Sequence, residues 1–184
     1  MPEIIIAIVG PDKPGLVHKV SQVLAARGGN IEEINQTTLK GQFAGLFSVS
    51  VPADLDQALL ESGLSEALSG TMSFSVFRPT SLTEPPEVEV QEPYVITLQG
   101  APSPSLIPGI TQTVASFEAN IDNLRALTLS GDQETPKKVL VLEISVPKKV
   151  QQRVFRQALS LTAEELGVEI SLQHRDIFES LHRL

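Results

Sequence analysis

The sequence contains no cysteine and no tryptophan, and aromatic side chains make up only 4% of its 184 residues. Without cysteine the chain forms no disulfide and offers no thiolate to a substrate or a metal, so it needs no oxidising compartment to fold. The scarcity of aromatic rings leaves no stacking platform for single-stranded nucleic acid.

Long apolar runs and an excess of positive charge are also missing. No stretch approaches the roughly 18 apolar residues of a transmembrane helix, and the chain begins without the basic and apolar regions of a secretion signal. The 14 basic residues are outnumbered by 22 acidic ones, and the formal net charge of −8 disfavours contact with phosphate backbones. We therefore expect a cytoplasmic protein that makes no direct contact with a membrane or with nucleic acid.

Residues that carry chemistry are few. The histidines are His18, His174 and His182, and none has a neighbour at the spacing of a metal site or of a nucleophile and its base. No glycine-rich phosphate loop is present. The sequence therefore predicts no catalytic residue, no metal site and no cofactor.

The chain does contain two copies of one pattern. Residues 4–34 and 94–124 both read as an apolar strand that ends in glycine, a helix, and then Asn-Ile with a further strand. At an offset of 90, Gly10 aligns with Gly100 and Asn30 with Asn120. A tandem repeat in a chain of this length indicates two small domains.

The first copy opens with a strand and a helix. Residues 4–9 form a continuous apolar run of strand length, which is typical of a central strand. The helix that follows has Pro14 in its first turn, an apolar stripe at Val20 and Leu24, and Gly28-Gly29 at its end.

A hairpin, a second helix and a last strand complete this copy. Residues 31–39 and 43–51 are joined by a short glycine-containing turn, which predicts antiparallel pairing. Asp54 then caps a helix that Gly63 can interrupt, and residues 72–76 alternate between apolar and serine as a half-buried strand does.

The second copy repeats this order, with five additional residues in its hairpin loop near 130–138. Its second helix carries apolar residues at helical spacing, namely Val150, Val154, Ala158 and Leu161.

Each copy therefore has the order strand, helix, strand, strand, helix, strand. Right-handed crossovers turn this order into the α+β ferredoxin-like fold, a four-stranded antiparallel sheet with two helices on one face. We expect domains at 1–78 and 93–176, an acidic proline-rich linker at 79–92 and a C-terminal tail at 177–184. The other sheet face, with Ile5, Ala7 and Val9, is then left for a partner.

The most specific local feature is the segment 10–16, where the first strand turns into the first helix. The free N–H groups at a helix N-terminus attract a carboxylate, Asp12 can meet an ammonium group and Lys13 a second anion. Gly15 permits close approach. The alternative is a tight turn in which Asp12 only caps the helix. Asn30 either binds a ligand or only takes the left-handed conformation after the double glycine.

The run Gly-x-Asp-x-Pro-Gly-Leu, followed by a helix and Gly-x-Asn-Ile, resembles the ACT domain family of amino-acid sensors. The resemblance covers both copies and is of the kind seen in small tandem ACT regulators such as glycine-cleavage repressors. It implies that an amino acid binds at the interface of paired modules. The implied site consists of Asp12, Lys13, Pro14, Gly15, Leu16, Asn30 and Ile31.

The second copy departs from the pattern, because Ala101, Pro102 and Ser105 stand where the first has Pro11, Asp12 and Gly15. It is therefore expected to be a structural partner or to bind something else.

Two functional hypotheses follow. In the first, the chain is a non-catalytic, amino-acid-binding homodimer that acts through a regulatory protein partner on amino-acid metabolism, including that of glycine, or on its transcription. In the second it is a ligand-free interaction or dimerisation module, in which the tail residues Ile177, Leu181 and Leu184 engage a partner. An enzyme is disfavoured, because ACT modules in enzymes accompany a separate catalytic domain.

Overall fold

The computed structural model describes residues 1–79, 90–129 and 136–176. The chain divides into two compact units, Met1–Glu84 and Pro85–Leu184, and each is considered by itself. Within the described ranges no helix is long and apolar enough to cross a membrane. The tail at 177–184 and most of the expected linker lie outside the described residues.

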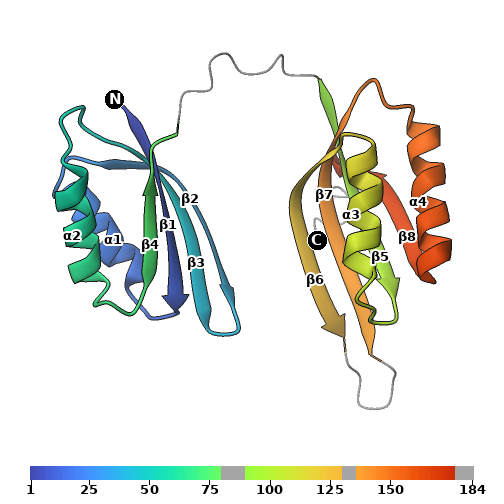
Figure 1. The fold of residues 1–184 in the computed structure, drawn as a ribbon, viewed down its shortest axis with the longest axis horizontal. Helices are drawn as coiled ribbons and strands as arrows, with labels where there is room; N and C mark the ends of the chain where they lie inside the picture. Colours follow the sequence, from blue (N-terminus) through green and yellow to red (C-terminus); the bar gives the residue numbers. More distant parts are fainter. Residues whose placement is uncertain (80–89, 130–135, 177–184) are drawn as a thin grey trace. The chain divides into compact units, whose positions relative to one another are not determined.

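The first unit is a four-stranded antiparallel sheet with two helices on one face (Figure 1). The sheet order is β2-β3-β1-β4, so β1 is a central strand and β2 an edge strand. This is the predicted ferredoxin-like arrangement. Its elements are β1 Glu3–Pro11, α1 Leu16–Ala25, β2 Asn30–Leu39, β3 Gln42–Ser50, α2 Gln57–Ala67 and β4 Ser73–Phe77.

The second unit repeats the architecture, with sheet order β6-β7-β5-β8. Its first strand begins two residues before the expected domain start at 93. Its elements are β5 Gln91–Gly100, α3 Leu106–Ser116, β6 Asn120–Leu129, β7 Lys137–Pro147, α4 Gln152–Leu166 and β8 Glu169–His174.

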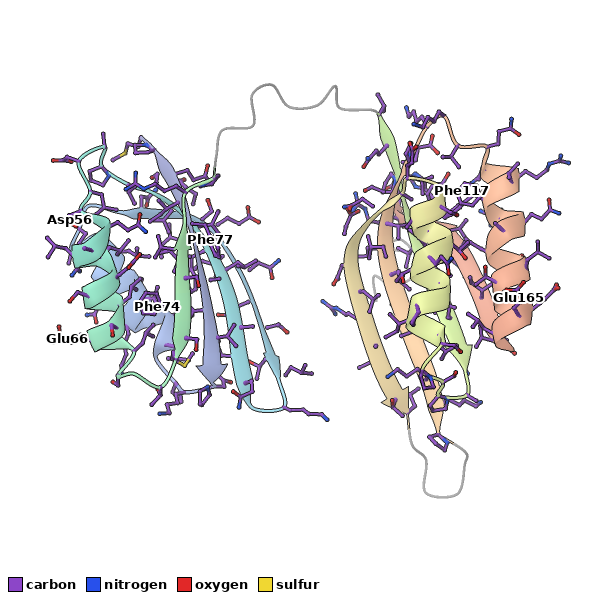
Figure 2. The ribbon with its side chains drawn as sticks, in the orientation of Figure 1. Asp56, Glu66, Phe74, Phe77, Phe117 and Glu165 are labelled. Atoms are coloured by element: carbon purple, nitrogen blue, oxygen red, sulfur yellow. The ribbon has the colours of Figure 1, made fainter. Side chains whose placement is uncertain are left out.

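Each unit has its own apolar core between sheet and helices. In the first, alternate residues of β1 (Ile4, Ile6 and Ile8) are buried under the helices, while Ile5 and Ala7 lie half-buried on the other face. Phe74 packs toward the same core, and Phe77 at the end of β4 is 53% exposed (Figure 2). Among the described residues, both units thus leave one sheet face without helices, as predicted.

Three local predictions were wrong. Helix α2 is capped by Asp56 (labelled in Figure 2) rather than Asp54. The Asp56 carboxylate accepts from the N–H groups of Ala58 and Leu59 at 2.9 and 3.3 Å. Helix α2 also runs unbroken through Gly63. Pro14 precedes the N-cap of α1 instead of lying in its first turn.

The apolar stripe predicted for the second helix of the second unit was also wrong. Val154 and Leu161 are 44% and 53% exposed. The buried residues are instead Phe155, Leu159 and Ala163. Phe155 contacts Phe117 edge to face, with ring centroids 5.1 Å apart, which fixes the side of α4 that turns inward.

Candidate functional site

The loop after β1 is fastened to the β2–β3 turn. The Asp12 N–H donates to the Gly41 carbonyl at 2.9 Å, and the Thr38 hydroxyl donates to the Asp12 carboxylate at 3.3 Å. Asp12 is therefore directed toward the end of β2 and does not cap α1, whose N-cap is Gly15. The capping alternative for Asp12 was wrong.

Gly15 leaves the first turn of α1 open. Its φ of 85° lies in the left-handed region, no side chain caps the helix, and a Cβ built there would meet no atom within 4 Å. The first N–H groups of a helix have no partner within the helix, and they attract anions. Among the described residues, no side chain occupies the space next to Gly15.

The other residues of the segment play different parts. Lys13 and Pro14 are exposed beside the open turn. Leu16 is only 8% exposed and belongs to the core, so only its backbone can face a ligand.

Asn30 and Ile31 lie at the opposite end of the sheet. In the strand register Asn30 pairs with Ser50, which pairs with Glu3, whereas Leu39 pairs with Gln42, next to Pro11. The ten residues of β2 therefore separate Asn30 from the loop by about 30 Å. One unit does not bring the two predicted halves of the site together.

Asn30 is the first residue of β2 and is not left-handed, so that alternative was wrong. Its side-chain amide donates to Glu32 at 2.9 Å, and the Ser50 hydroxyl donates to the same carboxylate oxygen at 2.7 Å. These hydrogen bonds, that from Ser50 first, hold the pKa of Glu32 below its usual value. Ile31 is half-buried against the core.

The second unit contains the same trio. The Asn120 amide donates to Asp122 at 2.7 Å, and the Ser145 hydroxyl donates to the other oxygen of that carboxylate at 2.6 Å. The sequence reasoning missed both trios. Glu32 aligns with Asp122 at the offset of the repeat, but the serine comes from across the hairpin and is identified only once the register is known.

The loop of the second unit contains hydrogen bonds within itself. Ser103 and Ser105 share a hydrogen bond of 2.7 Å between their hydroxyls, and the Ser105 N–H donates to the Ser103 hydroxyl. Ser105 has an ordinary helical φ of −80° where Gly15 has a positive one. The two loops therefore differ in shape as well as in sequence.

The helix-free face of the first sheet is apolar in its middle. Val9 and Leu46 are 52% and 54% exposed there, and shallow depressions of about 180 and 240 Å³ lie over this face. Ala7 and Leu46 line the first and Ile5 and Leu46 the second. The face on which a partner is predicted thus carries an exposed apolar strip.

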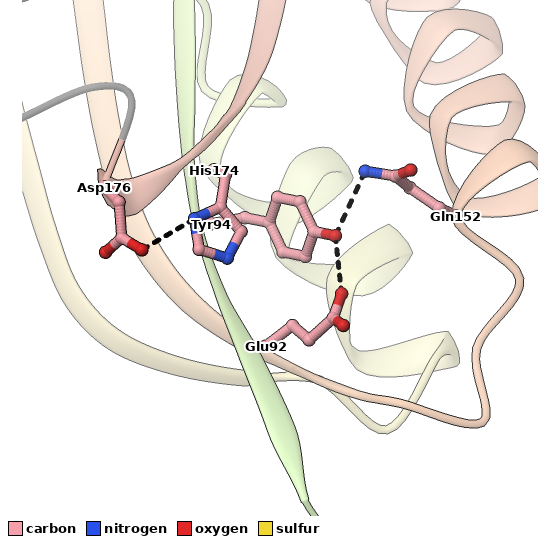
Figure 3. Close-up of polar contacts among 5 residues, drawn as sticks. All are labelled: Glu92, Tyr94, Gln152, His174 and Asp176. Carbon is pink, nitrogen blue, oxygen red and sulfur yellow. Dashed lines mark hydrogen bonds and ion pairs between the residues drawn. The ribbon is translucent and has the colours of Figure 1, made fainter.

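One polar network in the second unit includes a buried phenol (Figure 3). The Tyr94 hydroxyl donates to Glu92 at 2.8 Å and accepts from the Gln152 amide at 3.1 Å, and its ring meets that of His174 edge to face. Burial first, and then the Glu92 carboxylate, raise the pKa of Tyr94. His174 lies 3.5 Å from Asp176. No group of three potential metal ligands occurs in the described ranges.

Comparison with protein families identifies the same kind of domain in both units. One ACT domain model matches residues 3–75, and a second ACT domain model matches residues 94–173.

Curated relatives match one unit or both. A UPF0237 protein of Methanococcus maripaludis is 39% identical over 95 residues, which is 50% of this chain and 99% of the relative. A UPF0237 protein of Methanopyrus kandleri is 30% identical over 49% of this chain and 96% of its own length. The phosphoserine phosphatase SerB2 of Mycobacterium tuberculosis is 25% identical over 92% of this chain, which spans only 40% of that enzyme.

Two solved structures resemble the whole chain. A structure described as an unknown protein from Galdieria sulphuraria has a TM-score of 0.80 and 27% identity, covering 94% of this chain and 98% of that one. A protein assigned as a glycine cleavage system transcriptional repressor has a TM-score of 0.65 and 18% identity, with 94% and 96% covered. The second likeness concerns the fold alone.

Proposed function

Because the chain belongs to the ACT domain family, with one such domain in each unit, we propose that it is a non-catalytic regulatory protein that binds an amino acid at the segment 12–16. The observation that carries this proposal is the open first turn of α1 at Gly15. Its N–H groups receive the carboxylate of the amino acid, while Lys13 adds positive charge nearby.

Pairing of two copies supplies the other half of the site. Strand β2 is an edge strand whose residues are exposed or half-buried along its whole length. Antiparallel pairing of β2 with β2 of a second copy in full register places Asn30 of one copy opposite Leu39 of the other. Thr38, beside Leu39, contacts Asp12. A homodimer of this kind therefore brings Asn30 of one copy near the segment 12–16 of the other. Within a single unit these two regions are far apart.

The regulatory step follows from differential affinity. An amino acid held by both copies favours the paired arrangement over the unpaired one, and a partner protein that recognises only one arrangement responds to the amino-acid concentration. The resemblance of the fold to a glycine-cleavage repressor supports a role in amino-acid metabolism or its transcription, with glycine among the candidate ligands. The acidic composition disfavours direct action on DNA and so supports action through a partner protein.

Titration calorimetry of the full chain with each standard amino acid tests the proposal. We expect heat from at least one of them, and Asp12→Ala is expected to weaken that binding by roughly 1 to 3 kcal/mol because a charged hydrogen-bond partner is lost. Thr38→Val is the matched control, since it removes the hydroxyl beside Asp12 and leaves the charge. Absence of heat with every amino acid, at protein concentrations suited to micromolar affinity, contradicts the proposal.

A ligand-free interaction module is the second candidate, favoured by the exposed Val9 and Leu46 on the helix-free face. If burial of this face is the whole activity, Leu46→Glu lowers the oligomeric mass measured by light scattering, and no amino acid changes that mass. Leu39→Glu, on the β2 edge that the first proposal pairs, separates the two candidates, because it lowers the mass only if β2 pairs with β2 of a second copy.

A further inference from the structure

The trio of asparagine, carboxylate and serine at the start of β2 and β6 is the feature that the proposed function leaves unexplained. Glu32 is the additional residue of a β-bulge between Ile31 and Glu33, and Asp122 occupies the corresponding bulge between Ile121 and Asn123. Each carboxylate receives one hydrogen bond from the asparagine two residues before it and one from a serine across the hairpin.

Folding stability is a weak reason for this arrangement. Asn30, Glu32 and Asp122 are exposed, and hydrogen bonds between exposed polar groups add little to the free energy of unfolding. Both copies nevertheless have the trio, whereas the loops that lead into α1 and α3 differ in sequence and in conformation. The strand start is therefore more alike in the two units than the loop is.

The chemistry of the trio fixes the direction of the asparagine amide. An ionised carboxylate only accepts hydrogen bonds, so Asn30 must turn its NH₂ group toward Glu32. Its carbonyl oxygen is then directed away from the carboxylate. The hydrogen bond from Ser50 holds the carboxylate in place and favours its charged form.

We propose that Glu32 is a positioning residue that sets the Asn30 amide so that its carbonyl oxygen accepts a hydrogen bond from a donor group, the ammonium group of a bound amino acid. Asp122 fixes the direction of the Asn120 amide in the same way, but no ligand is assigned to it, because the loop of that unit has Ser105 where the first has Gly15. The assignment of the ammonium group rests on the proposed function. The orientation of the amide does not, so the two parts are tested separately.

The test uses three full-length variants. Glu32→Gln introduces a side chain that both donates and accepts, so the Asn30 amide loses its fixed direction. Glu32→Asp restores an acceptor-only group of the kind that the second unit uses at Asp122. Asp122→Asn is the matched control, since it makes the same chemical change in the unit whose loop has Ser105 where the first has Gly15.

The first measurement is nuclear magnetic resonance of the side-chain amides. In the wild type the Asn30 amide resonances follow the ionisation of Glu32 as pH is varied. This dependence is expected to disappear in Glu32→Gln and to persist in Glu32→Asp and Asp122→Asn. The inference is overturned if the Asn30 resonances of the wild type do not change with pH. It is also overturned if their pH dependence in Glu32→Gln is the same as in the wild type.

The second measurement is calorimetry with each standard amino acid in turn. Loss of one oriented hydrogen bond in Glu32→Gln is expected to weaken the best binder about tenfold, while Glu32→Asp and Asp122→Asn bind as the wild type does. A purely structural role predicts equal loss of melting temperature in Glu32→Gln and Asp122→Asn with unchanged affinity, which overturns the inference. Absence of heat in the wild type refutes the proposed function, and the amide resonances then decide the orientation alone.

Discussion

At the scale of single residues, two glycines of the first unit meet different structural requirements. Gly10 is required by contact, because a Cβ there would lie 2.5 Å from the Met72 sulfur. Gly15 is required by conformation, because it meets nothing yet has φ of 85°. The repeat retains the first requirement, since Gly100 faces Val168 in the same way, and has lost the second. Only Gly15 is therefore tied to the open helix turn.

Gly15→Ala is expected to destabilise the protein by about 1 kcal/mol, since an L-residue is strained at positive φ. Ser105→Ala, at the corresponding position with φ of −80°, lacks this strain and is expected to cost less. Chemical denaturation measures both. Equal losses of unfolding free energy would show that the left-handed backbone at Gly15 is not what makes glycine necessary.

Tyr94 gives a spectroscopic prediction, because it is the only tyrosine in the chain and there is no tryptophan. Burial and Glu92 raise its pKa, so the native protein should form tyrosinate at higher pH than the chain in denaturant, which titrates near 10. The folded state favours the neutral phenol. Its contribution to stability is thus complete below the unfolded pKa and is lost as pH rises through the folded one.

Ultraviolet absorbance as a function of pH tests this prediction. Tyr94→Phe is expected to abolish the absorbance change and to flatten the alkaline decline of unfolding free energy. Coincident native and denatured titrations would contradict the assigned environment of the phenol.

At the scale of elements, most of the fold could be predicted because each copy alternates clear strand and helix periods with glycine and proline at the boundaries. Strand order followed from chain order and crossover handedness. Helix α4 could not be oriented, since Val154 and Leu161 lie on one helical stripe and Phe155 and Leu159 on another. Which stripe of α4 is buried depends on the contact of Phe155 with Phe117, the C-cap residue of α3.

The candidate site was predicted less completely. The segment 12–16 was found because its turn chemistry is local in sequence, although Asp12 bonds to Thr38 in place of capping α1. The distance between this segment and Asn30 follows from the register of β2 on β3, which the sequence patterns alone did not resolve. The role of Glu32 was missed for the same reason, since Ser50 reaches it across the hairpin.

The cap of α2 gives a prediction at this scale. Asp56→Ala is expected to cost about 1 kcal/mol of unfolding free energy, because two N–H groups lose their acceptor. Asp54→Ala, two residues earlier and outside the helix, is the control and is expected to change stability by less than about 0.5 kcal/mol. The reverse order of the two losses would place the cap at Asp54.

At the scale of the whole molecule, the two units share an architecture and a strand-start trio but not a loop. The first loop has a left-handed glycine at position 15, whereas the second has Ser105 in a helical conformation, hydrogen-bonded to Ser103. If the loop decides whether an amino acid binds, each chain has one site and each homodimer two.

Calorimetry is accordingly expected to give a stoichiometry near one amino acid per chain. Gly15→Asp, which adds a negative charge at the open turn, should abolish the heat, whereas Ser105→Asp should leave it unchanged. A stoichiometry near two, or loss of binding in Ser105→Asp alone, would assign the site to the second unit or to both.

The arginine that follows α1 ties its end to the neighbouring helix. The Arg27 guanidinium donates to the Leu59 carbonyl of α2 at 3.2 Å and to the Val23 carbonyl of α1 at 3.1 Å. It fills the space beside Gly63, where a Cβ would lie 2.2 Å from its nitrogen. Glycine is unfavourable inside a helix, but at position 63 it leaves room for the Arg27 guanidinium that links α1 to α2. Through these two hydrogen bonds, an axial shift of α1 would be passed on to α2.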